Sequence, residues 1–314
     1  MRNSLPPLSL PDQSGRTWLV TGATNGLGRE VAQSAASAGA RVLLAVRDVE
    51  RGQQVARGLS DASVVPLDLA DLASVRAAAA AVTEPVDVVV NNAGTVSGQR
   101  RETVDGFELM LGTNALGPFA FTNLILPLVK DRIVIVGSGA HRWTRMDFAD
   151  PHFTRRKFSF QVGYGQSKLA GMLWGLGLSR RLARTPPAAV IPTSARTPAA
   201  HRLNDDDAHP AVQLAHPGWA HTNLQNQTSW KVVSGLVGAA AIFGGQSAQD
   251  GAQNILVAAT RDLPECSYVG PDGRGEMKGA PSLVGRSAHA SNPELADVFW
   301  EFAQAATGTQ FPAM

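Results

Sequence analysis

The sequence contains very little cysteine: among 314 residues, Cys266 stands alone. A single cysteine cannot form an intramolecular disulfide, and it cannot supply the several thiolates of a structural zinc site. The seven histidines show no His-x-x-x-His spacing that would place two ligands on one helix face. We therefore expect a fold that relies on neither a metal ion nor disulfide bonds.

Excess charge and long apolar runs are also lacking. The net charge of +2 gives no electrostatic reason to expect a nucleic-acid partner. Residues 1–14 contain three prolines and no continuous apolar core, so we interpret them as a lead-in and not as a signal peptide or anchor. The longest apolar stretch, Val232 to Gly245, is shorter than the ~20 residues that span a bilayer. These features predict a cytoplasmic protein without a membrane partner.

From Thr17 onward, short apolar runs alternate with helical patterns, as in successive βαβ units. This alternation predicts a doubly wound α/β fold, a Rossmann-type parallel sheet of about seven strands with helices on both faces. No repeat or second core is visible, so residues 15–314 are expected to form a single domain. The expected strands are Thr17–Val20, Arg41–Val46, Ser63–Leu67, Val86–Val90, Arg132–Val136, Ala211–Ala215 and, at the sheet edge, Ser267–Val269.

A glycine-rich turn joins the first expected strand to the next helical pattern. Its glycines let the backbone turn tightly and approach a pyrophosphate, which the free N–H groups of the helix N-terminus attract. A glycine triplet alone is weak evidence, but here it lies between a strand and a helix, as phosphate binding requires. The candidate cofactor-binding residues of this turn are Gly22, Thr24, Asn25, Gly26, Leu27 and Gly28.

The tip of the second expected strand carries Val46, Arg47 and Asp48. At this place an acidic side chain binds the ribose hydroxyls of NAD, whereas a basic one accommodates the extra phosphate of NADP. Arg47 therefore favours NADP(H) as the cofactor. The alternative is a surface arginine paired with Asp48 or Glu50, and Asp48 keeps NAD(H) open.

Two further strand ends carry candidate cofactor contacts. Asp68 and Leu69 follow the third expected strand, where Asp68 either faces an adenine edge or simply begins the loop. The fourth strand is followed by Asn92, Ala93 and Gly94. Small and amide residues suit a ligand crevice at the carboxyl end of a parallel strand, and they are equally common as turn formers.

Tyr164 and Lys168 stand four residues apart in a helical pattern, so they share one helix face. An ammonium held near a phenol favours the phenolate and brings a tyrosine into the range of general acid/base catalysis. The plain alternative is a half-buried tyrosine near a solvated lysine, because such pairs are frequent by accident.

Three motifs follow one another in order: Thr21-Gly22-x-x-x-Gly26-x-Gly28, Asn91-Asn92-Ala93-Gly94 and Tyr164-x-x-x-Lys168. Together they resemble the short-chain dehydrogenase/reductase family, over almost the whole chain. The resemblance is closer to the branch of retinol-dehydrogenase-like and protochlorophyllide-reductase-like enzymes. Its marks are Ala45-Val46-Arg47-Asp48, Asn114-Ala115-Leu116-Gly117-Pro118-Phe119, Ser138-Gly139-Ala140-His141, Gly251-Ala252-Gln253 and Phe299-Trp300-Glu301.

The resemblance implies an NADP(H)-dependent oxidoreductase that interconverts a ketone or aldehyde and an alcohol. Tyr164 would donate and accept the proton, while Lys168 would lower the tyrosine pKa and bind the nicotinamide ribose. Ser138, placed by its register to His141, would orient the substrate oxygen. Asn114 would hold a water in a proton relay to the lysine.

The resemblance also assigns roles to the later part of the chain. The turn at Pro217 and Gly218 would face the nicotinamide, unless it is an ordinary turn, and Thr222 would bind the carboxamide or the phosphates. Residues 219–246 would form a substrate lid whose apolar residues favour a hydrophobic substrate. Residues 184–210, rich in proline, alanine, arginine and aspartate, are interpreted as a surface insertion.

The 25 residues between Ser138 and Tyr164 form a longer connection than is usual in the wider family. Its aromatic residues either wall a substrate pocket or pin the loop to the body, and such insertions leave both a monomer and a homodimer open. The aromatic residues of this loop are Trp143, Phe148, Phe153, Phe158 and Phe160.

Two other functions also remain open. They are the reduction of an activated carbon–carbon double bond and the role of a non-catalytic NADP sensor.

Overall fold

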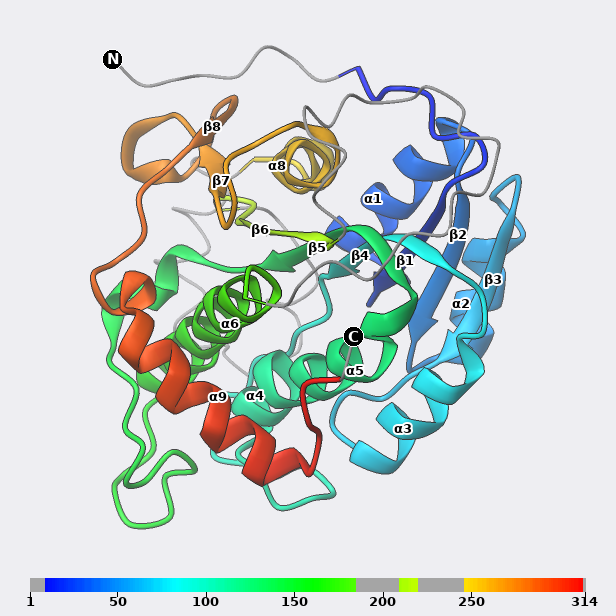
Figure 1. The fold of residues 1–314 in the computed structure, drawn as a ribbon. Coiled ribbons are helices and arrows are strands. Elements are labelled where there is room, and N and C mark those ends of the chain that lie inside the picture. Colours follow the sequence, from blue (N-terminus) through cyan, green and yellow to red (C-terminus); the bar gives the residue numbers. More distant parts are fainter. Residues whose placement is uncertain (1–8, 185–208, 220–245, 313–314) are drawn as a thin grey trace.

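The computed structural model describes residues 9–184, 209–219 and 246–312, which build one sheet covered by helices (Figure 1). The strand order is β3-β2-β1-β4-β5-β6-β7-β8, in which β8 alone is antiparallel to its neighbour. The strands are β1 (Thr17–Thr21), β2 (Arg41–Val46), β3 (Ala62–Pro66), β4 (Val86–Asn91), β5 (Val129–Val136), β6 (Ala211–Ala215), β7 (Tyr268–Pro271) and β8 (Pro281–Leu283).

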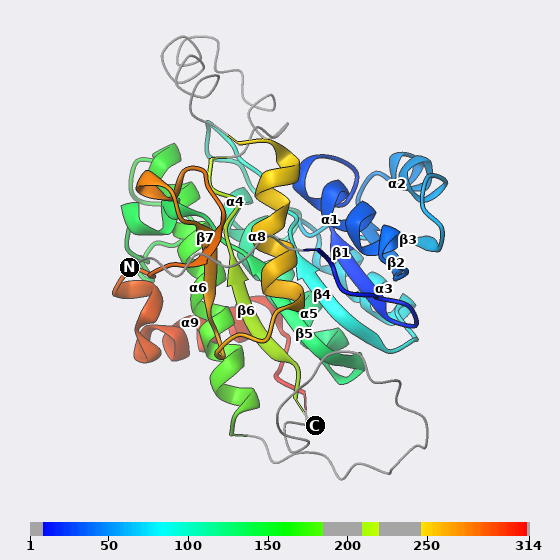
Figure 2. The same ribbon diagram turned by 90° about the horizontal axis from the view of Figure 1, so that it is seen from above.

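Helices cover both faces of the sheet (Figures 1 and 2). One face carries α1 (Gly26–Ser37), α2 (Val49–Ala56) and α8 (Ala248–Thr260). The opposite face carries α3 (Leu72–Ala81), α4 (Leu109–Leu111), α5 (Gly117–Ile125) and α6 (Phe160–Leu182), with α9 (Pro293–Thr307) packed on α6. A π-helical segment, Gly112–Leu116, joins α4 to α5.

The chain changes its winding direction between β1 and β4. Because β1 pairs with β2 on one side and with β4 on the other, the connections that leave their carboxyl ends diverge to opposite faces. A crevice opens beyond the strand ends at such a switch point. The turn after β1 and the segments after β4 and β5 all meet at this edge of the sheet, so candidate residues far apart in sequence become neighbours.

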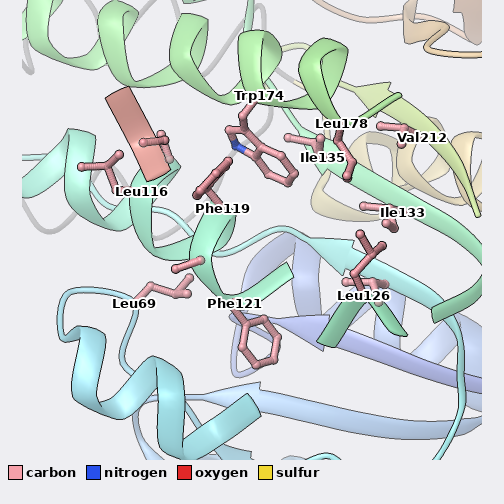
Figure 3. Close-up of a cluster of buried hydrophobic side chains, with 14 of the residues drawn as sticks. Leu69, Leu116, Phe119, Phe121, Leu126, Ile133, Ile135, Trp174, Leu178 and Val212 are labelled. Atoms are coloured by element: carbon pink, nitrogen blue, oxygen red, sulfur yellow. The ribbon is translucent and has the colours of Figure 1, made fainter. Parts of the chain in front are cut away.

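Two apolar layers, one on each face of the sheet, hold the fold together. The layer under α5 and α6 contains large aromatic rings, and Phe119 meets Trp174 and Trp300 edge-on at centroid distances of 6.5 and 4.8 Å (Figure 3). The layer under α1 and α8 consists mostly of alanine and valine. Small side chains there allow these two helices to approach the strands closely.

One helical stretch among the described residues, Leu109–Leu128, is long and apolar enough to cross a membrane by length and composition. Its most apolar window is 83% buried inside the protein. Leu116, Phe119 and Phe121 point from it into the aromatic layer (Figure 3). Core packing therefore accounts for its apolar character.

The predicted doubly wound parallel fold is confirmed, and β2 and β6 have the predicted bounds. The prediction that Ser267–Val269 is the last strand, at the sheet edge, is wrong. β8 follows β7 and pairs with it from Val269–Leu283 to Pro271–Pro281, which gives eight strands in the described chain. Three residues are too few for an alternating pattern to be recognised in the sequence.

Several predicted segments fall outside the described residues. They are most of the lead-in (residues 1–8), nearly all of the insertion (residues 185–208) and nearly all of the lid, including Thr222 (residues 220–245). Their predicted roles stay predictions.

We expect opposite effects on stability from alanine at two helical glycines. At Gly117 a Cβ would lie 2.3 Å from the Leu69 carbonyl oxygen, so Gly117→Ala should lower the free energy of unfolding by about 1–3 kcal/mol. At Gly171 the nearest atom would be 3.9 Å away, so Gly171→Ala should raise it by up to about 1 kcal/mol through helix propensity. Urea unfolding of both variants measures the difference. Equal effects would contradict the tight approach at Gly117.

Candidate functional site

The glycine turn between β1 and α1 packs directly against the end of β4. Gly22 and Gly26 have φ values of +68° and +51°, which disfavour other residues. A Cβ at Gly28 would lie 2.4 Å from the Asn92 side-chain nitrogen and 2.6 Å from the Gly22 carbonyl oxygen. The turn therefore has no room for side chains on its inner side.

Thr21 and Asn92 join β1 to β4 beneath this turn. The Thr21 hydroxyl oxygen accepts hydrogen bonds from the backbone N–H groups of Asn92 and Ala93, at 3.0 and 2.9 Å. The Asn92 side chain donates back to the Thr21 carbonyl at 2.9 Å. The side chain of Asn92 thus supports the glycine turn. The motif therefore forms a turn, and this turn lies at the end of β4, where the crevice opens.

The N-terminus of α1 has no side-chain cap and no acidic residue in its first turn. By contrast, the first N–H groups of α2, α3, α8 and α9 are capped by aspartate, serine or asparagine side chains. Uncapped N–H groups and the helix dipole together favour an anion. The part of the turn nearest this helix is formed by Thr24, Asn25 and Leu27, which are partly exposed.

Arg47 is exposed at the tip of β2, and within the described part of the chain it makes no ion pair. Its neighbour Asp48 caps α2 by accepting from the Arg51 N–H at 3.0 Å. The carboxylate that kept NAD(H) open is therefore engaged in a helix cap, whereas the Arg47 guanidinium is available to a ligand.

The two candidate residues of the segment after β3 make different contacts. The Asp68 carboxylate accepts from the Ala70 N–H at 2.9 Å, so it begins the loop as one of the two interpretations expected. Leu69 is 5% exposed and its side chain packs in the core against Gly117. Only the backbone of Leu69 is left to face a ligand.

Asn114 lies inside the π-helical segment, where the Gly117 N–H donates to the carbonyl of Gly112, five residues earlier. The side chain oxygen of Asn114 accepts from the Thr95 N–H at 2.7 Å, and its nitrogen donates to the Thr95 carbonyl at 3.0 Å. The same nitrogen donates to the Ser167 hydroxyl at 3.0 Å. The widened turn thereby places Asn114 between the end of β4 and α6.

Helix α6 presents Tyr164 and Lys168 to the same place. The Lys168 ammonium is buried, 6.0 Å from the centre of the Tyr164 ring, and donates to the Val136 carbonyl at 3.0 Å. Gly94 lies beside it, because a Cβ there would be 3.7 Å from the Lys168 nitrogen and 3.3 Å from the Asn114 oxygen. The predicted set Asn114, Tyr164 and Lys168 is therefore brought together, with Gly94 facing the lysine.

Burial raises the pKa of Tyr164, and the side chain of Ser138 lowers it in part. Burial also lowers the pKa of Lys168 to about 8. The predicted lowering of the tyrosine pKa by Lys168 is not found in this structure. The ammonium lies on the carbonyl of Val136, and desolvation of the phenol is the larger effect.

Ser138 stands just past the end of β5, next to Tyr164. Its hydroxyl oxygen accepts from the Ala140 N–H at 3.2 Å and begins the 3₁₀ turn Gly139–Trp143. His141 of this turn is fully buried, with Nδ1 2.7 Å from the Ser138 carbonyl oxygen. The serine is thus held at its hydroxyl and at its carbonyl.

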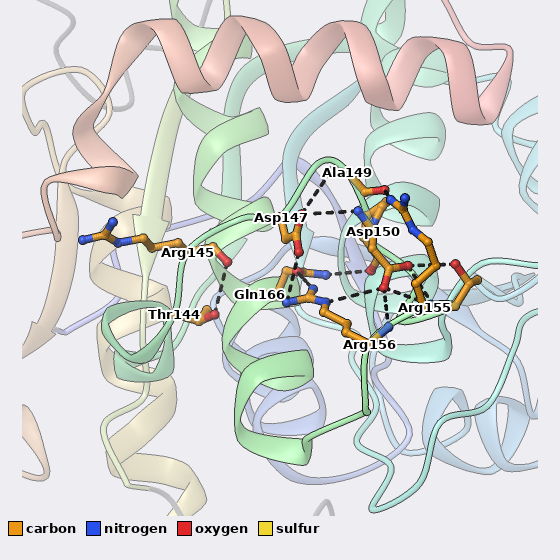
Figure 4. A network of polar contacts seen from close by, with 10 residues as sticks. Thr144, Arg145, Asp147, Ala149, Asp150, Arg155, Arg156 and Gln166 are labelled. Atoms are coloured by element: carbon orange, nitrogen blue, oxygen red, sulfur yellow. Dashed lines mark hydrogen bonds and ion pairs between the residues drawn. The ribbon is translucent and has the colours of Figure 1, made fainter.

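The loop between Ser138 and Tyr164 is organised around the buried carboxylate of Asp150 (Figure 4). Asp150 accepts from the backbone N–H groups of Thr154, Arg155 and Arg156, which hold its pKa well below the usual range although burial opposes this. Arg156 also donates to the Gln166 side chain at 2.9 Å and so ties the loop to α6 two residues after Tyr164. The loop is a defined structure at the mouth of the site.

The aromatic residues of this loop divide between the two roles that were open. Phe148 packs on Phe302 of α9, and Phe153, 4% exposed, packs on Phe158, so these rings pin the loop to the body. Phe160 stacks on the Tyr164 ring at 6.0 Å with an interplanar angle of 11°. Trp143 is 62% exposed. Phe160 thus lies against the ring of Tyr164, and Trp143 is exposed.

The turn after β6 is fixed by contacts with the β7–β8 connection. Gly218 has φ +67°, and the Pro217 carbonyl accepts from the Gln246 side chain. The Gly218 N–H donates to Nδ1 of His216 at 3.3 Å, and Nε2 of His216 lies 3.1 Å from the Glu276 carboxylate. Pro217 and Gly218 are thereby held just past the end of β6, and their role toward the nicotinamide stays a prediction.

Sequence reasoning missed four supporting residues: Thr95, Ser167, His216 and Tyr268. Ser167 donates to the Tyr164 carbonyl at 2.8 Å and accepts from Asn114, and its position next to Lys168 in the motif was a usable signal. Thr95 directly follows Gly94 and His216 directly precedes Pro217, so both also lie next to a motif, whereas Tyr268 becomes a neighbour only through the sheet order.

Residues 16–150 match the short chain dehydrogenase family. Over 288 residues the chain is 36% identical to polyprenol dehydrogenase of Mus musculus, which covers 86% of this chain and 78% of that protein. Over 181 residues it is 39% identical to retinol dehydrogenase 13 of Homo sapiens, which covers 54% of this chain and 55% of that protein.

Two solved structures extend the comparison to the fold. An uncharacterized protein from Mycobacterium paratuberculosis superposes with a TM-score of 0.79 at 36% identity, over 99% of this chain and 100% of that one. A short chain dehydrogenase from Burkholderia cenocepacia, crystallised with NADP, gives a TM-score of 0.58 at 23% identity, over 80% of this chain and 92% of that one.

We expect Lys168 to make stability rise with pH. Its pKa is about 8 in the folded protein and about 10.4 in an unfolded chain. Between these values the unfolded state binds more protons, so the free energy of unfolding increases with pH, by up to about 3 kcal/mol. Thermal or urea unfolding at pH 7 and pH 10 should show this gain relative to Lys168→Met, in which the other titrations cancel. A constant difference between the two proteins would show that Lys168 is not desolvated.

Proposed function

We propose that this chain, which belongs to the short-chain dehydrogenase family, uses NADP(H) to interconvert a hydrophobic ketone or aldehyde and its alcohol. Membership rests on identities of 36% and 39% to polyprenol and retinol dehydrogenases, which bear out the resemblance read from the motifs. The observation that carries the proposal is the convergence of Ser138, Tyr164 and Lys168 at the carboxyl edge of the sheet.

The residues present fit a dinucleotide phosphate. The glycine turn excludes side chains from its inner surface, and the N-terminus of α1 is uncapped. Arg47, which makes no ion pair with any described residue, supplies a cation where the 2′-phosphate of NADP would need one, and Asp48 is engaged in its cap. Gly94 leaves space beside the Lys168 ammonium for a ribose.

The protein's own groups provide proton transfer and orientation. The bound nicotinamide supplies the hydride in the reductive direction and accepts it in the oxidative one. Tyr164 donates its phenolic proton to the oxygen that becomes the alcohol, and Ser138 holds that oxygen by a hydrogen bond. A proton then returns from solvent to the phenolate through Lys168 and a water held at Asn114.

An apolar substrate is supported by the side chains beside Tyr164. Phe160 stacks on its ring, and Trp143, in the 3₁₀ turn that follows Ser138, is mostly exposed. The two relatives are named for retinol and polyprenol, which are both apolar alcohols. We therefore expect longer aliphatic or aromatic carbonyls to be better substrates than short charged ones.

Tyr164→Phe tests the mechanism directly. With NADPH and a carbonyl panel containing decanal, an aromatic ketone and an enone, the wild type should reduce the aldehyde or ketone. The variant should lose at least about 100-fold in kcat, since its ring has no proton to give. NADPH binding, followed by the fluorescence of the reduced cofactor, should be nearly unchanged. Turnover that survives in Tyr164→Phe would refute the proposed role, and reduction of the enone's double bond alone would refute the reaction.

Arg47→Ala tests the cofactor preference. Because only NADP carries the extra phosphate, the variant should bind NADPH about tenfold more weakly and NADH as well as the wild type does. Arg51→Ala is the matched control, since it removes another exposed arginine, in the first turn of α2. Isothermal titration with both cofactors measures the effect, and equal losses for NADPH and NADH would overturn the assignment of Arg47.

A further inference from the structure

The 3₁₀ turn after Ser138 is attached to the far end of the chain by two consecutive side chains. Ser287 N–H donates to Nε2 of His141 at 3.1 Å, across 146 residues of sequence. Arg142 donates to the Gly285 carbonyl and lies 3.2 Å from the Glu276 carboxylate. The segment after β8 therefore supports the turn that carries the serine.

These contacts fix the tautomer of His141. A backbone N–H can only donate, so Nε2 must accept from Ser287 and carry no hydrogen. Nδ1 then bears the hydrogen and donates it to the Ser138 carbonyl at 2.7 Å. Both nitrogens are satisfied only in this one neutral form. Burial lowers the pKa of His141 to about 4, although the Ser138 contact opposes this, so the neutral form prevails at pH 7.

The surroundings of the ring leave it little freedom. His141 is fully buried, and Tyr268 meets it edge-on at a centroid distance of 5.7 Å. The charged or titratable groups around it are Arg142, His216 and Glu276, of which the glutamate alone is an anion. Tyr268 is itself 2% exposed, and its hydroxyl has no hydrogen-bond partner among the described residues.

The position of Ser138 matters to Tyr164, because its side chain offsets part of the rise that burial causes in the tyrosine pKa. The Ser138 hydroxyl oxygen accepts from the Ala140 N–H, and the Ser138 carbonyl accepts from the His141 ring at 2.7 Å and from the His141 backbone N–H at 3.2 Å. Loss of the ring contact would remove the shorter of the two hydrogen bonds to the serine carbonyl and allow the hydroxyl to move away from the phenol.

We propose that His141 is a positioning residue that donates from Nδ1 to the Ser138 carbonyl, is itself held by Ser287, and so keeps the serine hydroxyl against the Tyr164 phenol. This role rests on the proposed function, in which Ser138 and Tyr164 act together on the substrate oxygen. It adds a tether that runs from the C-terminal segment to the substrate-orienting serine.

Two substitutions of His141 test the hydrogen bonds of its two ring nitrogens one at a time. In His141→Asn the amide nitrogen replaces Nδ1 and can still donate to Ser138, whereas in His141→Gln the longer amide reaches toward Ser287 and abandons Ser138. With decanal and NADPH, His141→Asn should keep kcat within about threefold of the wild type, and His141→Gln should lose about tenfold or more, with KM and NADPH affinity little changed. If His141→Gln is as active as His141→Asn, the ring serves only to fill space and the proposal is overturned.

A second readout needs no turnover. The chain has two tyrosines, and burial holds the pKa of Tyr268 far above its usual value, so phenolate absorbance on raising the pH reports Tyr164 first. His141→Gln should raise the pKa of Tyr164, and His141→Asn should leave it at the wild-type value. The signal must persist in Tyr268→Phe and disappear in Tyr164→Phe. An unchanged titration in His141→Gln overturns the proposal.

The wild type alone provides a test that does not depend on variants folding. Nitrogen-15 NMR of histidine-labelled protein should show His141 as the Nδ1–H tautomer, still neutral at pH 5.5. An Nε2–H tautomer could not donate from the ring to the Ser138 carbonyl and would overturn the proposal. If the wild type reduces no carbonyl in the panel, the proposed function fails, while the tautomer and the tyrosine titration still decide the role of His141.

Discussion

The pairing of the Asn114 carboxamide with the backbone of Thr95 is the constraint on which the site depends. It uses both polar atoms of one buried side chain to close the end of β4 against a helix, as strand neighbours would. A regular α-helix would not bring the amide to this place; the π-helical turn does, and such bulges are frequent at functional sites. Through Ser167 the same amide reaches the backbone of Tyr164. One residue thus sets the distance between the sheet and the helix that carries the tyrosine and lysine.

Much of this arrangement could be predicted because it is local. The glycine turn, the tip of β2 and the Tyr164–Lys168 spacing each lie within one strand–turn–helix unit, where residue order dictates geometry. Ser138 and Asn114 were found by resemblance, and the sheet places them near α6 as that resemblance implied. The fold class followed from alternating apolar runs, whose bounds were right for β2 and β6.

The remainder could not be predicted, because it depends on contacts between distant segments. The tether from His141 to Ser287 and the contact of His216 with Glu276 each cross many tens of residues. The rise of the Tyr164 pKa by burial could not be predicted for a related reason, since desolvation depends on everything packed around the phenol and not on the lysine four residues away. Strand β8 escaped notice because three residues carry no periodicity.

The sheet begins and ends on short strands that contain proline, Pro66 in β3 and Pro281 in β8. Each proline removes an N–H group that an incoming strand would need for pairing. The valine-rich strands between them have the composition that promotes runaway β-association when an edge is left open. The prolines thus make both edge strands poor partners for a further strand. Addition of a further strand is therefore disfavoured at both edges of the described sheet.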